Sequence, residues 1–256
     1  MSVCVLHLGD CLEKMDSIPT EGVDLVLCDL PYGTTACKWD AVIPFDALWK
    51  HYGRIAKPNA AIILFAAQPF TSSLVMSNPR QFKYEWIWEK NTATNGLNAK
   101  RQPVRYHESI LVFYTSQPTY NQQMVPRKQS ARNRVRSGIS GSPKTSSHYT
   151  GLGEIGKRFY DVENVYPKST LYFEGVPNSS GKMHPTQKPI ALIEYLIRTY
   201  TNPGNTVLDN CMGSGTVGVA CINTGRNFIG IEKGCRLFRH CRQTYPRSLS
   251  PDSCIR

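Results

Sequence analysis

The sequence predicts an α/β fold in which helices cover both faces of a parallel sheet. Two observations support this fold class. Short apolar segments rich in β-branched residues alternate with amphipathic segments along most of the 256 residues. Two of the apolar segments also end in a carboxylate and a tight turn, the place where open α/β sheets bind ligands. Strands that alternate with helices favour parallel pairing, because each crossover returns the chain to the same edge of the sheet.

Local patterns predict the elements in chain order. Apolar runs predict buried strands at 3–8, 23–28, 60–66, 84–88, 108–114, 206–208 and 228–231. Helical spacing predicts helices at 11–18, 45–55, 69–76 and 189–200, and small residues predict one more helix after a glycine loop at 213–218. Pro203 and Gly204 end the helix before them. The polar tail at 246–256 is expected to fray.

The segment 116–183 differs in character from the rest of the chain. It is rich in Ser, Gly, Asn, Gln and Pro, and it carries a net charge of +6 out of the +11 of the whole chain. Cations that follow phosphates and aromatic residues that stack on bases favour a nucleic-acid-binding insertion. The alternative is a flexible basic linker. The predicted organisation is therefore 1–115 and 184–245 as two halves of one domain, with 116–183 inserted between them.

The bulk composition excludes several classes of protein. A net charge of +11 and a pI near 9.3 favour a polyanionic partner, nucleic acid before an acidic membrane surface, against the alternative of a merely basic protein. No segment approaches the ~18 continuous apolar residues of a membrane span. The first residues lack the pattern of a secretion signal. The nine cysteines are scattered without metal-ligand spacing, so reduced thiols in a cytoplasmic protein without a metal are expected.

The segment Asp29-Leu30-Pro31-Tyr32 ends the predicted strand at 23–28. Pro31 prevents the strand from continuing, so Asp29 and Tyr32 are expected on a stiff turn at the carboxyl edge of the sheet. A carboxylate, a turn carbonyl and an aromatic face together can hold a planar base that bears an exocyclic amine. The alternative is a strand-ending turn with a solvated carboxylate.

A second candidate site follows the predicted strand at 206–208. Asp209 precedes the glycine loop at 213–218, and Glu232 ends the next strand at the spacing of an acid that binds ribose hydroxyls. Glycines allow the backbone to turn tightly and to approach a ligand closely. This layout is typical of a nucleotide-binding βαβ unit. The alternatives are an NAD site and a glycine-rich connection without a ligand.

Together these motifs resemble the β-class amino-methyltransferases of DNA, which use S-adenosylmethionine. The resemblance rests on the tetrad at 29–32, the cofactor loop at 209–216 and their order, with the basic region between them. It implies a Rossmann-like methyltransferase sheet with a circularly permuted motif order, and 116–183 as the target-recognition region. The acidic first residue of the tetrad implies methylation of adenine N6 in double-stranded DNA, with the base flipped out of the helix.

The resemblance also assigns roles to single residues. The catalytic residues are Asp29, Leu30, Pro31 and Tyr32. The residues that bind S-adenosylmethionine are Asp10, Asp29, His184, Thr186, Lys188, Asp209, Met212, Gly213, Ser214, Gly215, Thr216 and Glu232. Two departures from the family pattern stand out. Leu30 replaces a proline whose carbonyl is the part used, and Cys211 replaces a phenylalanine that contacts the adenine of the cofactor.

Candidate DNA contacts are the polar and basic residues on either side of the predicted strand at 108–114 and at the start of the insertion. They are Lys90, Asn98, Lys100, Arg101, Arg105, Arg127, Lys128, Arg132, Arg134 and Arg136, and the alternative for the first five is a solvated basic loop. Alternative functions are cytosine-N4 methylation and a non-catalytic nucleic-acid-binding protein. The resemblance is also compatible with a homodimer, with a cognate restriction endonuclease and with a prokaryotic or phage-infected cell.

Overall fold

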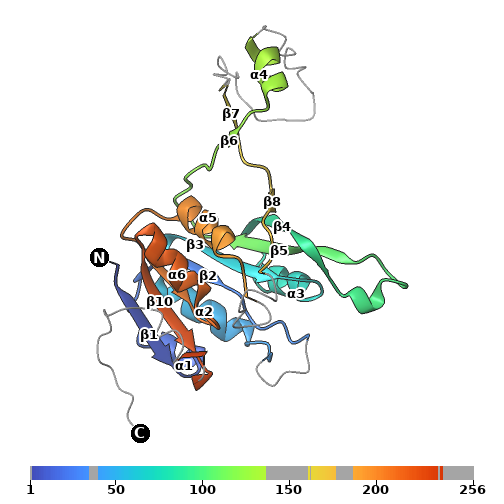
Figure 1. Cartoon of the computed structure of the whole chain (residues 1–256). Coiled ribbons are helices and arrows are strands. Elements are labelled where there is room, and N and C mark those ends of the chain that lie inside the picture. Colours follow the sequence, from blue (N-terminus) through green and yellow to red (C-terminus); the bar gives the residue numbers. More distant parts are fainter. Residues whose placement is uncertain are drawn as a thin grey trace. The chain divides into compact units, whose positions relative to one another are not determined.

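The computed structural model describes residues 2–34, 40–136, 161, 163–176, 187–235 and 237–238. The chain forms two compact units, one of residues 1–121 and 169–256 and one of residues 122–168, and each is described by itself. The first unit contains an eight-stranded sheet in the order β1-β10-β9-β2-β3-β5-β4-β8 (Figure 1). Its strands are β1 (Cys4–Leu8), β2 (Val23–Cys28), β3 (Ala56–Ala66), β4 (Phe82–Thr94), β5 (Arg105–Phe113), β8 (Thr170–Tyr172), β9 (Thr206–Asp209) and β10 (Asn227–Glu232).

The sheet is mixed, which corrects the prediction of a purely parallel sheet. β1, β10, β9, β2 and β3 pair in parallel, whereas β5 is antiparallel to both β3 and β4. The physical reason is the connection between β4 and β5, which is a hairpin loop at 95–104 and not a crossover helix. β4 consequently has the same direction as β3, and its carboxyl end lies at the same edge of the sheet as the end of β2.

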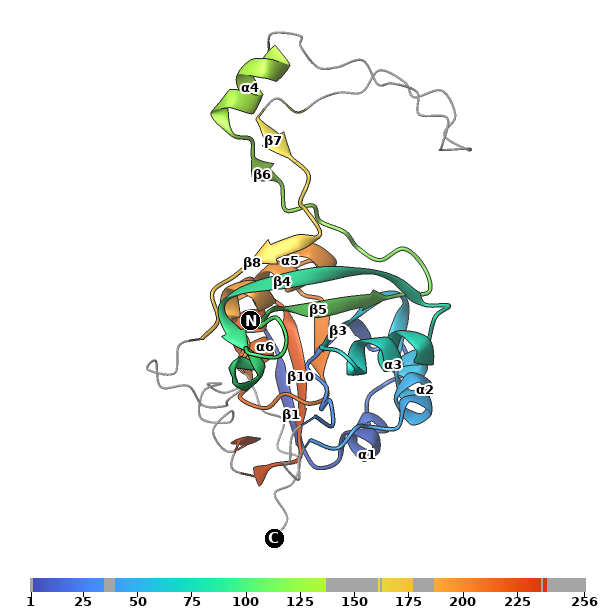
Figure 2. The same ribbon diagram turned by 90° about the vertical axis from the view of Figure 1, so that its right-hand side faces the viewer.

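Helices cover both faces of the sheet, as predicted. α1 (Cys11–Met15), α2 (Phe45–Ile55) and α3 (Phe70–Ser77) pack on one face, and α5 (Ile190–Tyr200) and α6 (Thr216–Thr224) pack on the other (Figure 2). Alternation along β2 explains the two layers. Leu25 and Leu27 point to the α5–α6 side, and Val26 and Cys28 point to the α1–α3 side.

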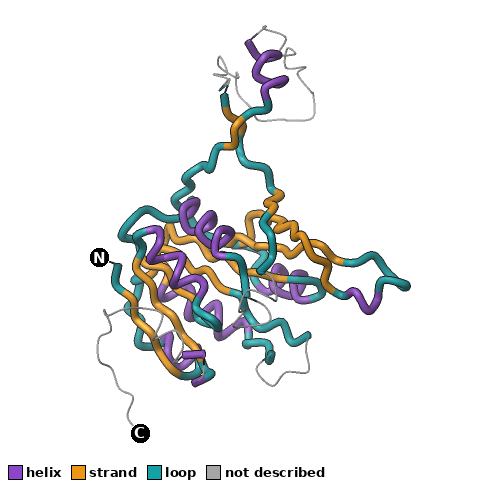
Figure 3. Tube along the Cα trace, viewed as in Figure 1, coloured by secondary structure: helices purple, strands orange, loops and turns teal. Residues whose placement is uncertain are grey.

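The second unit contains a short antiparallel pair and one helix. β6 (Val125–Pro126) pairs with β7 (Asn164–Val165), and α4 (Gln129–Arg136) follows β6. Figure 3 shows the strands and the helix of this unit in orange and purple. Within residues 122–168, Arg127 donates to the carbonyls of Asp161 and Asn164 at 2.9 and 3.1 Å.

Two further outcomes concern the element boundaries. β8 was not predicted, because three residues are too few to show a periodicity, and it places 170–172 in the main sheet although they fall within the predicted insertion. α2 has the predicted bounds, because eleven residues show one clear apolar face after Pro44. Within the described part of the chain, no helix combines the length and the apolar character that crossing a membrane requires.

Candidate active site at the carboxyl edge of the sheet

Four acidic residues predicted for the site lie at one edge of the sheet. β1, β10, β9 and β2 are neighbours with a common direction, and the register aligns Leu8 with Glu232 and Asp209 with Gly230. The loops after these strands are joined by backbone hydrogen bonds, from the Gly9 N–H to the Glu232 carbonyl at 3.0 Å and from the Met212 N–H to the Ile231 carbonyl at 3.0 Å. The parallel strands therefore bring together motifs that are about 200 residues apart in sequence.

The turn after β2 holds the Asp29 carboxylate from two sides. The Tyr32 hydroxyl donates to Oδ1 at 2.8 Å, and the Lys188 ammonium donates to Oδ2 at 2.7 Å. Leu30 is buried in the core on the α1–α3 side, so its side chain anchors the turn. Only 26% of the Asp29 side chain is exposed, and both of its oxygens have hydrogen-bond partners. The alternative of a solvated carboxylate at this turn is therefore wrong.

Asp40 is a site residue that the sequence analysis missed. Its carboxylate accepts hydrogen bonds from the backbone N–H groups of Gly33 and Thr34, both at 2.9 Å. Gly33 has a φ of 67°, a conformation that glycine adopts readily and that residues with side chains disfavour, and the two hydrogen bonds hold the turn in it. The sequence contains no signal for this contact, since residues 35–39 separate the partners. Asp40 thereby fixes the chain directly after Tyr32.

The Tyr32 ring stacks on Phe70, the first residue of α3. The ring centroids are 5.0 Å apart and the planes differ by 23°. Burial raises the pKa of Tyr32 well above its usual range, and the nearby carboxylates of Asp29 and Glu108 raise it further. The phenol therefore stays protonated and acts as a hydrogen-bond donor to Asp29. Phe70 is a second supporting residue that the sequence analysis did not identify.

Lys188 connects Asp29 to a second buried carboxylate, Glu108 on β5. The Lys188 Nζ lies 3.1 Å from Glu108 Oε2, and the Lys90 ammonium donates to Oε1 of the same carboxylate. Burial alone would raise the pKa of Glu108, but the charges of Lys188 and Lys90 outweigh burial and lower it. This pairing contradicts the predicted role of Lys90 in contacting DNA phosphate, because its side chain is 7% exposed and already neutralised.

The glycine loop between β9 and α6 is built around Asp209 and Glu232. Asp209 is buried and accepts from the Cys211 N–H at 3.1 Å, and burial raises its pKa to about 7. Glu232 accepts from the Gly213 N–H at 2.9 Å and from the Gly234 N–H at 2.6 Å. Burial also raises the pKa of Glu232. The acid predicted to bind ribose therefore also holds the backbone of the loop in place.

The remaining loop residues lead into α6, which begins at Thr216. Gly213 and Gly215 have φ values of 51° and 79°, and the Gly215 N–H donates to the Met212 carbonyl at 2.8 Å. Ser214 Oγ and Thr216 Oγ1 are 3.2 Å apart. Met212 is buried. These conformations are the ones that the glycines of the loop were predicted to supply.

Asp10 and Cys211 flank the same edge. Asp10 Oδ1 accepts from the Leu12 N–H at 3.0 Å and caps α1, and its Oδ2 accepts from the Lys233 ammonium at 3.2 Å. Cys211, at the position expected to be phenylalanine, has thiol contacts with Cys11 and Cys28. Three cysteine thiols are therefore neighbours at this end of the sheet. His184 and Thr186 lie outside the described residues.

The predicted DNA contacts fall into two groups with different surroundings. On the β4–β5 hairpin, Asn98, Lys100 and Arg101 are exposed and Arg105 is half-buried. The hairpin extends from the rest of the sheet (Figure 1). β4 has the same direction as β2, so the hairpin begins at the edge of the sheet where β2 ends and Asp29 follows. Its tip is the short 3-10 helix η1 (Gly96–Asn98), in which Leu97 is fully exposed. These placements are compatible with contact to a polyanion.

The second group lies in the unit of residues 122–168. Lys128 is exposed, whereas Arg132 pairs with Glu163 at 2.9 Å and donates to the Arg127 carbonyl at 2.8 Å. Arg127 and Arg132 thus hold this unit together, which is a structural use that their sequence pattern did not indicate. Arg134 and Arg136 belong to α4, but their side chains lie outside the described part of the chain.

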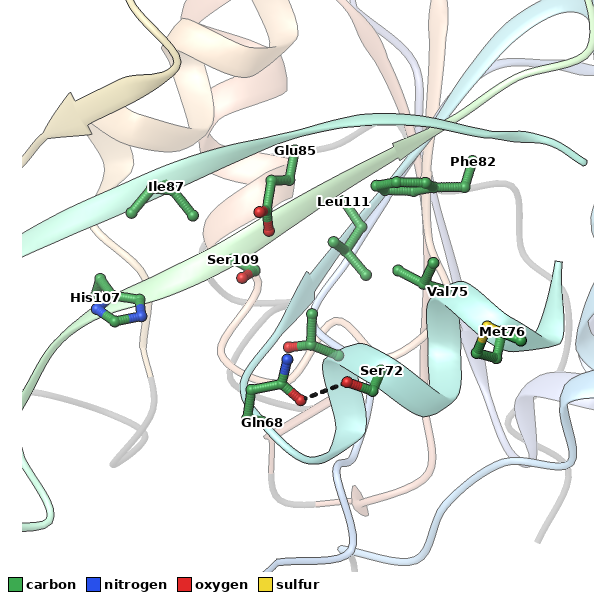
Figure 4. Close-up of a pocket in the computed structure, with 11 residues that line it drawn as sticks. Gln68, Ser72, Val75, Met76, Phe82, Glu85, Ile87, His107, Ser109 and Leu111 are labelled. Carbon is green, nitrogen blue, oxygen red and sulfur yellow. Dashed lines mark hydrogen bonds between the residues drawn. The ribbon is translucent and has the colours of Figure 1, made fainter. Parts of the chain in front are cut away.

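A cavity of about 420 Å³ lies between α3 and the strands β4 and β5 (Figure 4). Its lining includes Gln68, Glu85, His107 and Ser109, and Ser72 donates to Gln68 at 2.9 Å. None of the predicted site residues lines it. Among the described residues no cluster of three or more acids, histidines and cysteines is arranged to hold a metal ion. The edge with Asp29 and Asp209 is therefore the candidate active site.

Two curated proteins are similar to this chain in sequence. The type II methyltransferase M1.MboII of Moraxella bovis is 28% identical over 248 residues, which cover 89% of this chain and 90% of that protein. The DNA adenine methyltransferase YhdJ of Escherichia coli (strain K12) is 28% identical over 244 residues, covering 89% and 77%.

Solved structures show the same fold at low sequence identity. The M1.HpyAVI–SAM complex has a TM-score of 0.61 and 22% identity, and covers 95% of this chain and 100% of that one. The PvuII DNA methyltransferase, described as cytosine-N4-specific, has a TM-score of 0.67 and 15% identity over 97% of this chain and 88% of that one. The DNA methylase family model matches residues 23–242. Because this match spans both halves of the sheet and the site between them, the chain belongs to the N6/N4 DNA methylase family.

Proposed function

We propose that this DNA methylase transfers a methyl group from S-adenosylmethionine to the exocyclic N6 of an adenine in double-stranded DNA. The observation that carries the proposal is the Asp29 turn, in which Tyr32 and Lys188 orient the carboxylate of Asp29. This turn follows β2, and β2 pairs directly with β9, which leads into the Asp209 loop. An adenine amine needs such hydrogen-bond acceptors, because its lone pair is delocalised into the ring. The relative YhdJ, named a DNA adenine methyltransferase, supports adenine as the base.

The residues around the glycine loop fit S-adenosylmethionine. Asp209 is a buried carboxyl, and no described cationic side chain lies within ion-pair distance of it. An ammonium group such as that of a methionine-derived ligand would stabilise its ionised form. We assign Asp209 to this amino group, Glu232 to the ribose hydroxyls and residues 212–216 to the backbone contacts. The cofactor supplies an activated methyl group on a positively charged sulfur.

In the proposed reaction, Asp29 Oδ1 and the Leu30 carbonyl accept the two hydrogens of the amine. A carboxylate oxygen has two lone pairs, so Oδ1 can accept from the base and from Tyr32 together. The negative carboxylate stabilises the positive charge that develops on the nitrogen, and the proton leaves to solvent afterwards. Positioning and electrostatics therefore carry most of the rate enhancement assigned to these residues.

The proposal includes extrusion of the target base from the duplex, since the amine cannot reach Asp29 from inside a base stack. Phe70 supports one face of the Tyr32 ring. We assign the other face of that ring to the extruded base, with stacking worth ~1–3 kcal/mol. The exposed hairpin residues Lys100 and Arg101, and Lys128 in the second unit, are assigned to the phosphates.

Cytosine N4 is the second candidate substrate. The observation in its favour is the fold shared with the PvuII enzyme, which is described as cytosine-N4-specific. Cytosine also presents an exocyclic amine, so the same acceptors at Asp29 and Leu30 would serve. The acidic residue at the start of the tetrad favours adenine by resemblance to the β-class enzymes.

The deciding experiment is to express the chain in a methylation-deficient bacterial host and to analyse the digested DNA nucleosides by mass spectrometry. N6-methyladenine supports the proposal, and N4-methylcytosine transfers it to the second substrate. The absence of both, with folded protein present and with Asp29→Ala as the matched negative control, would support a non-catalytic DNA-binding protein. Sizing chromatography and the genomic neighbourhood test the homodimer and the restriction partner, which we propose only from the resemblance.

A further inference from the structure

A row of four alternating charges runs from the hairpin strands to the catalytic turn. Lys90 on β4 pairs with Glu108 on β5, Glu108 lies 3.1 Å from Lys188, and Lys188 donates to Asp29 at 2.7 Å. Three of these groups are not part of the tetrad. They come from three separate segments of the chain, so only the tertiary structure brings them together.

The row lies in a largely buried, aromatic environment. The Lys188 Nζ is 5.0 Å from the centroid of Phe65, and the Lys90 Nζ is 4.9 Å from the centroid of Trp88. Side-chain exposure is 9% for Lys188, 7% for Lys90 and 15% for Glu108. Ionised groups in such surroundings are tolerated only when they are paired, and removing one partner leaves the next charge uncompensated. The two negative charges of the carboxylates equal the two positive charges of the ammonium groups. Removal of any one group therefore leaves a neighbouring charge without its partner.

We propose that Glu108 and Lys90 are positioning residues for methyl transfer, acting through Lys188 on the carboxylate of Asp29. Glu108 holds the ammonium of Lys188 on the side away from Asp29. Lys188 in turn fixes Oδ2, so that Oδ1 is directed toward the amine of the base. Lys90 pairs with the other carboxylate oxygen of Glu108, Oε1. This inference rests on the proposed function of Asp29 and adds the residues that set its orientation.

Loss of Glu108 alone should be the most harmful change at the remote end of the row. Glu108→Gln keeps the shape of the side chain but leaves Lys188 and Lys90 as two neighbouring ammonium groups with one carboxylate. We expect the single-turnover methylation rate to fall by about tenfold or more, with little change in the dissociation constants for S-adenosylmethionine and for DNA.

A double-mutant cycle separates positioning from a general effect on the fold. Lys90→Met combined with Glu108→Gln removes one charge of each sign and leaves the Lys188–Asp29 pair intact. The double variant should therefore be faster than Glu108→Gln alone, by about fivefold or more, but slower than Lys90→Met, which keeps Glu108 beside Lys188. Glu89→Gln, at an exposed acid next to Lys90, is the matched control and should keep the wild-type rate.

The outcomes are distinct. A Glu108→Gln variant with the wild-type rate, or a double variant slower than both single variants, overturns the inference. If Glu108→Gln does not fold, as judged by thermal melting, the rates of Lys90→Met and of the double variant take its place. Wild-type rates in both would then overturn the inference, and lowered rates with unchanged cofactor affinity would support it. A wild-type protein that yields no methylated nucleoside refutes the proposed function. An active wild-type protein whose double variant is no faster than Glu108→Gln refutes only the role of Glu108 and Lys90.

Discussion

Asp29 directly follows the parallel strand β2 and Asp209 is the last residue of the parallel strand β9, yet their surroundings differ at the scale of single residues. Asp29 accepts from the Lys188 ammonium and the Tyr32 hydroxyl. Asp209 is more deeply buried, accepts from the Cys211 N–H and has a pKa raised to about 7. One carboxylate is therefore held by a cation of the protein itself, and the other is suited to a cation supplied by a ligand.

Replacement of Asp29 tests the catalytic assignment. Asp29→Asn keeps the size of the side chain but removes its negative charge and places an amide donor in the site. We expect the methylation rate to fall by at least about 100-fold, while DNA affinity in a gel-shift assay stays within about threefold. Asp46→Asn, at an exposed acid in the first turn of α2, is the control. Substantial activity in Asp29→Asn would refute the assignment.

The raised pKa of Asp209 predicts a pH-dependent stability. An unfolded aspartate ionises near pH 4, whereas the folded carboxyl ionises near pH 7. Below pH 4 both states are protonated, so the carboxyl has no net effect. Between pH 4 and pH 7 the unfolded state ionises first, and the native state is progressively destabilised. Above pH 7 this destabilisation is complete.

Asp209→Asn should therefore raise the free energy of unfolding, and more at pH 8 than at pH 4.5. The amide oxygen can keep the hydrogen bond from the Cys211 N–H, and we expect a gain of at least about 1 kcal/mol at pH 8. Urea unfolding at the two pH values measures it. The same variant should bind S-adenosylmethionine more weakly in calorimetry. An equal effect on stability at both pH values would contradict the pKa argument.

At the scale of elements, Arg226 joins the end of α5 to the end of α6. Its guanidinium donates to the Thr201 hydroxyl at 3.0 Å, to the Thr201 carbonyl at 2.7 Å and to the Thr224 carbonyl. Thr201 caps the end of α5, and Gly225, with a φ of 74°, ends α6. Because Arg226 is buried, these acceptors would have no access to water without it. The two helices that cover one face of the sheet thus share one side chain at their ends.

Arg226→Met should destabilise the protein by about 2–4 kcal/mol, because it fills a similar volume but leaves the buried acceptors unpaired. Denaturant unfolding monitored by tryptophan fluorescence measures the change. Arg80→Met, at an exposed arginine, is the matched control and should stay within about 0.5 kcal/mol of wild type. A small effect of Arg226→Met would mean that water replaces the guanidinium.

At the scale of the whole molecule, residues 122–168 form a compact unit of their own. The residues directly before and directly after this unit are hydrogen-bonded to the main sheet unit. The Asn121 N–H donates to the Thr199 carbonyl at 2.7 Å, and the Ser169 carbonyl accepts from the Ile87 N–H at 2.8 Å. The predicted insertion at 116–183 is wider than this unit, since residues 170–172 belong to the main sheet as β8. We propose that the compact unit carries target recognition.

Replacement of residues 122–168 by a flexible glycine-serine linker of about ten residues tests this division. The shortened protein should bind S-adenosylmethionine with unchanged affinity and melt within a few degrees of the full chain. Its affinity for a DNA duplex should fall by about tenfold or more, with a weaker dependence on salt, because phosphate contacts are lost. Unchanged DNA binding would assign recognition to the β4–β5 hairpin, which Lys100→Gln together with Arg101→Gln would then test.

The sequence by itself determined the layers of the fold and the positions of both motifs. Apolar runs and helical spacing located β2, α2 and α5, and the carboxylates Asp29 and Asp209 were each predicted at a strand end, where open α/β sheets bind ligands. The tight turn before α6 was predictable from Gly213 and Gly215 themselves, because glycine adopts a positive φ without strain. These features depend on residues that are close together in the chain.

Only the tertiary structure decided which side chains meet. Residues from separate segments meet in the antiparallel pairing of β5 and in the edge strand β8. They also meet in the hydrogen bonds that Asp40 accepts and in the row of charges from Lys90 to Asp29. Lys90 and Lys100 look alike as basic residues in the sequence, yet one is buried against Glu108 and the other is exposed. The physical reason is that burial and charge pairing depend on distances across the sheet, which local spacing does not encode.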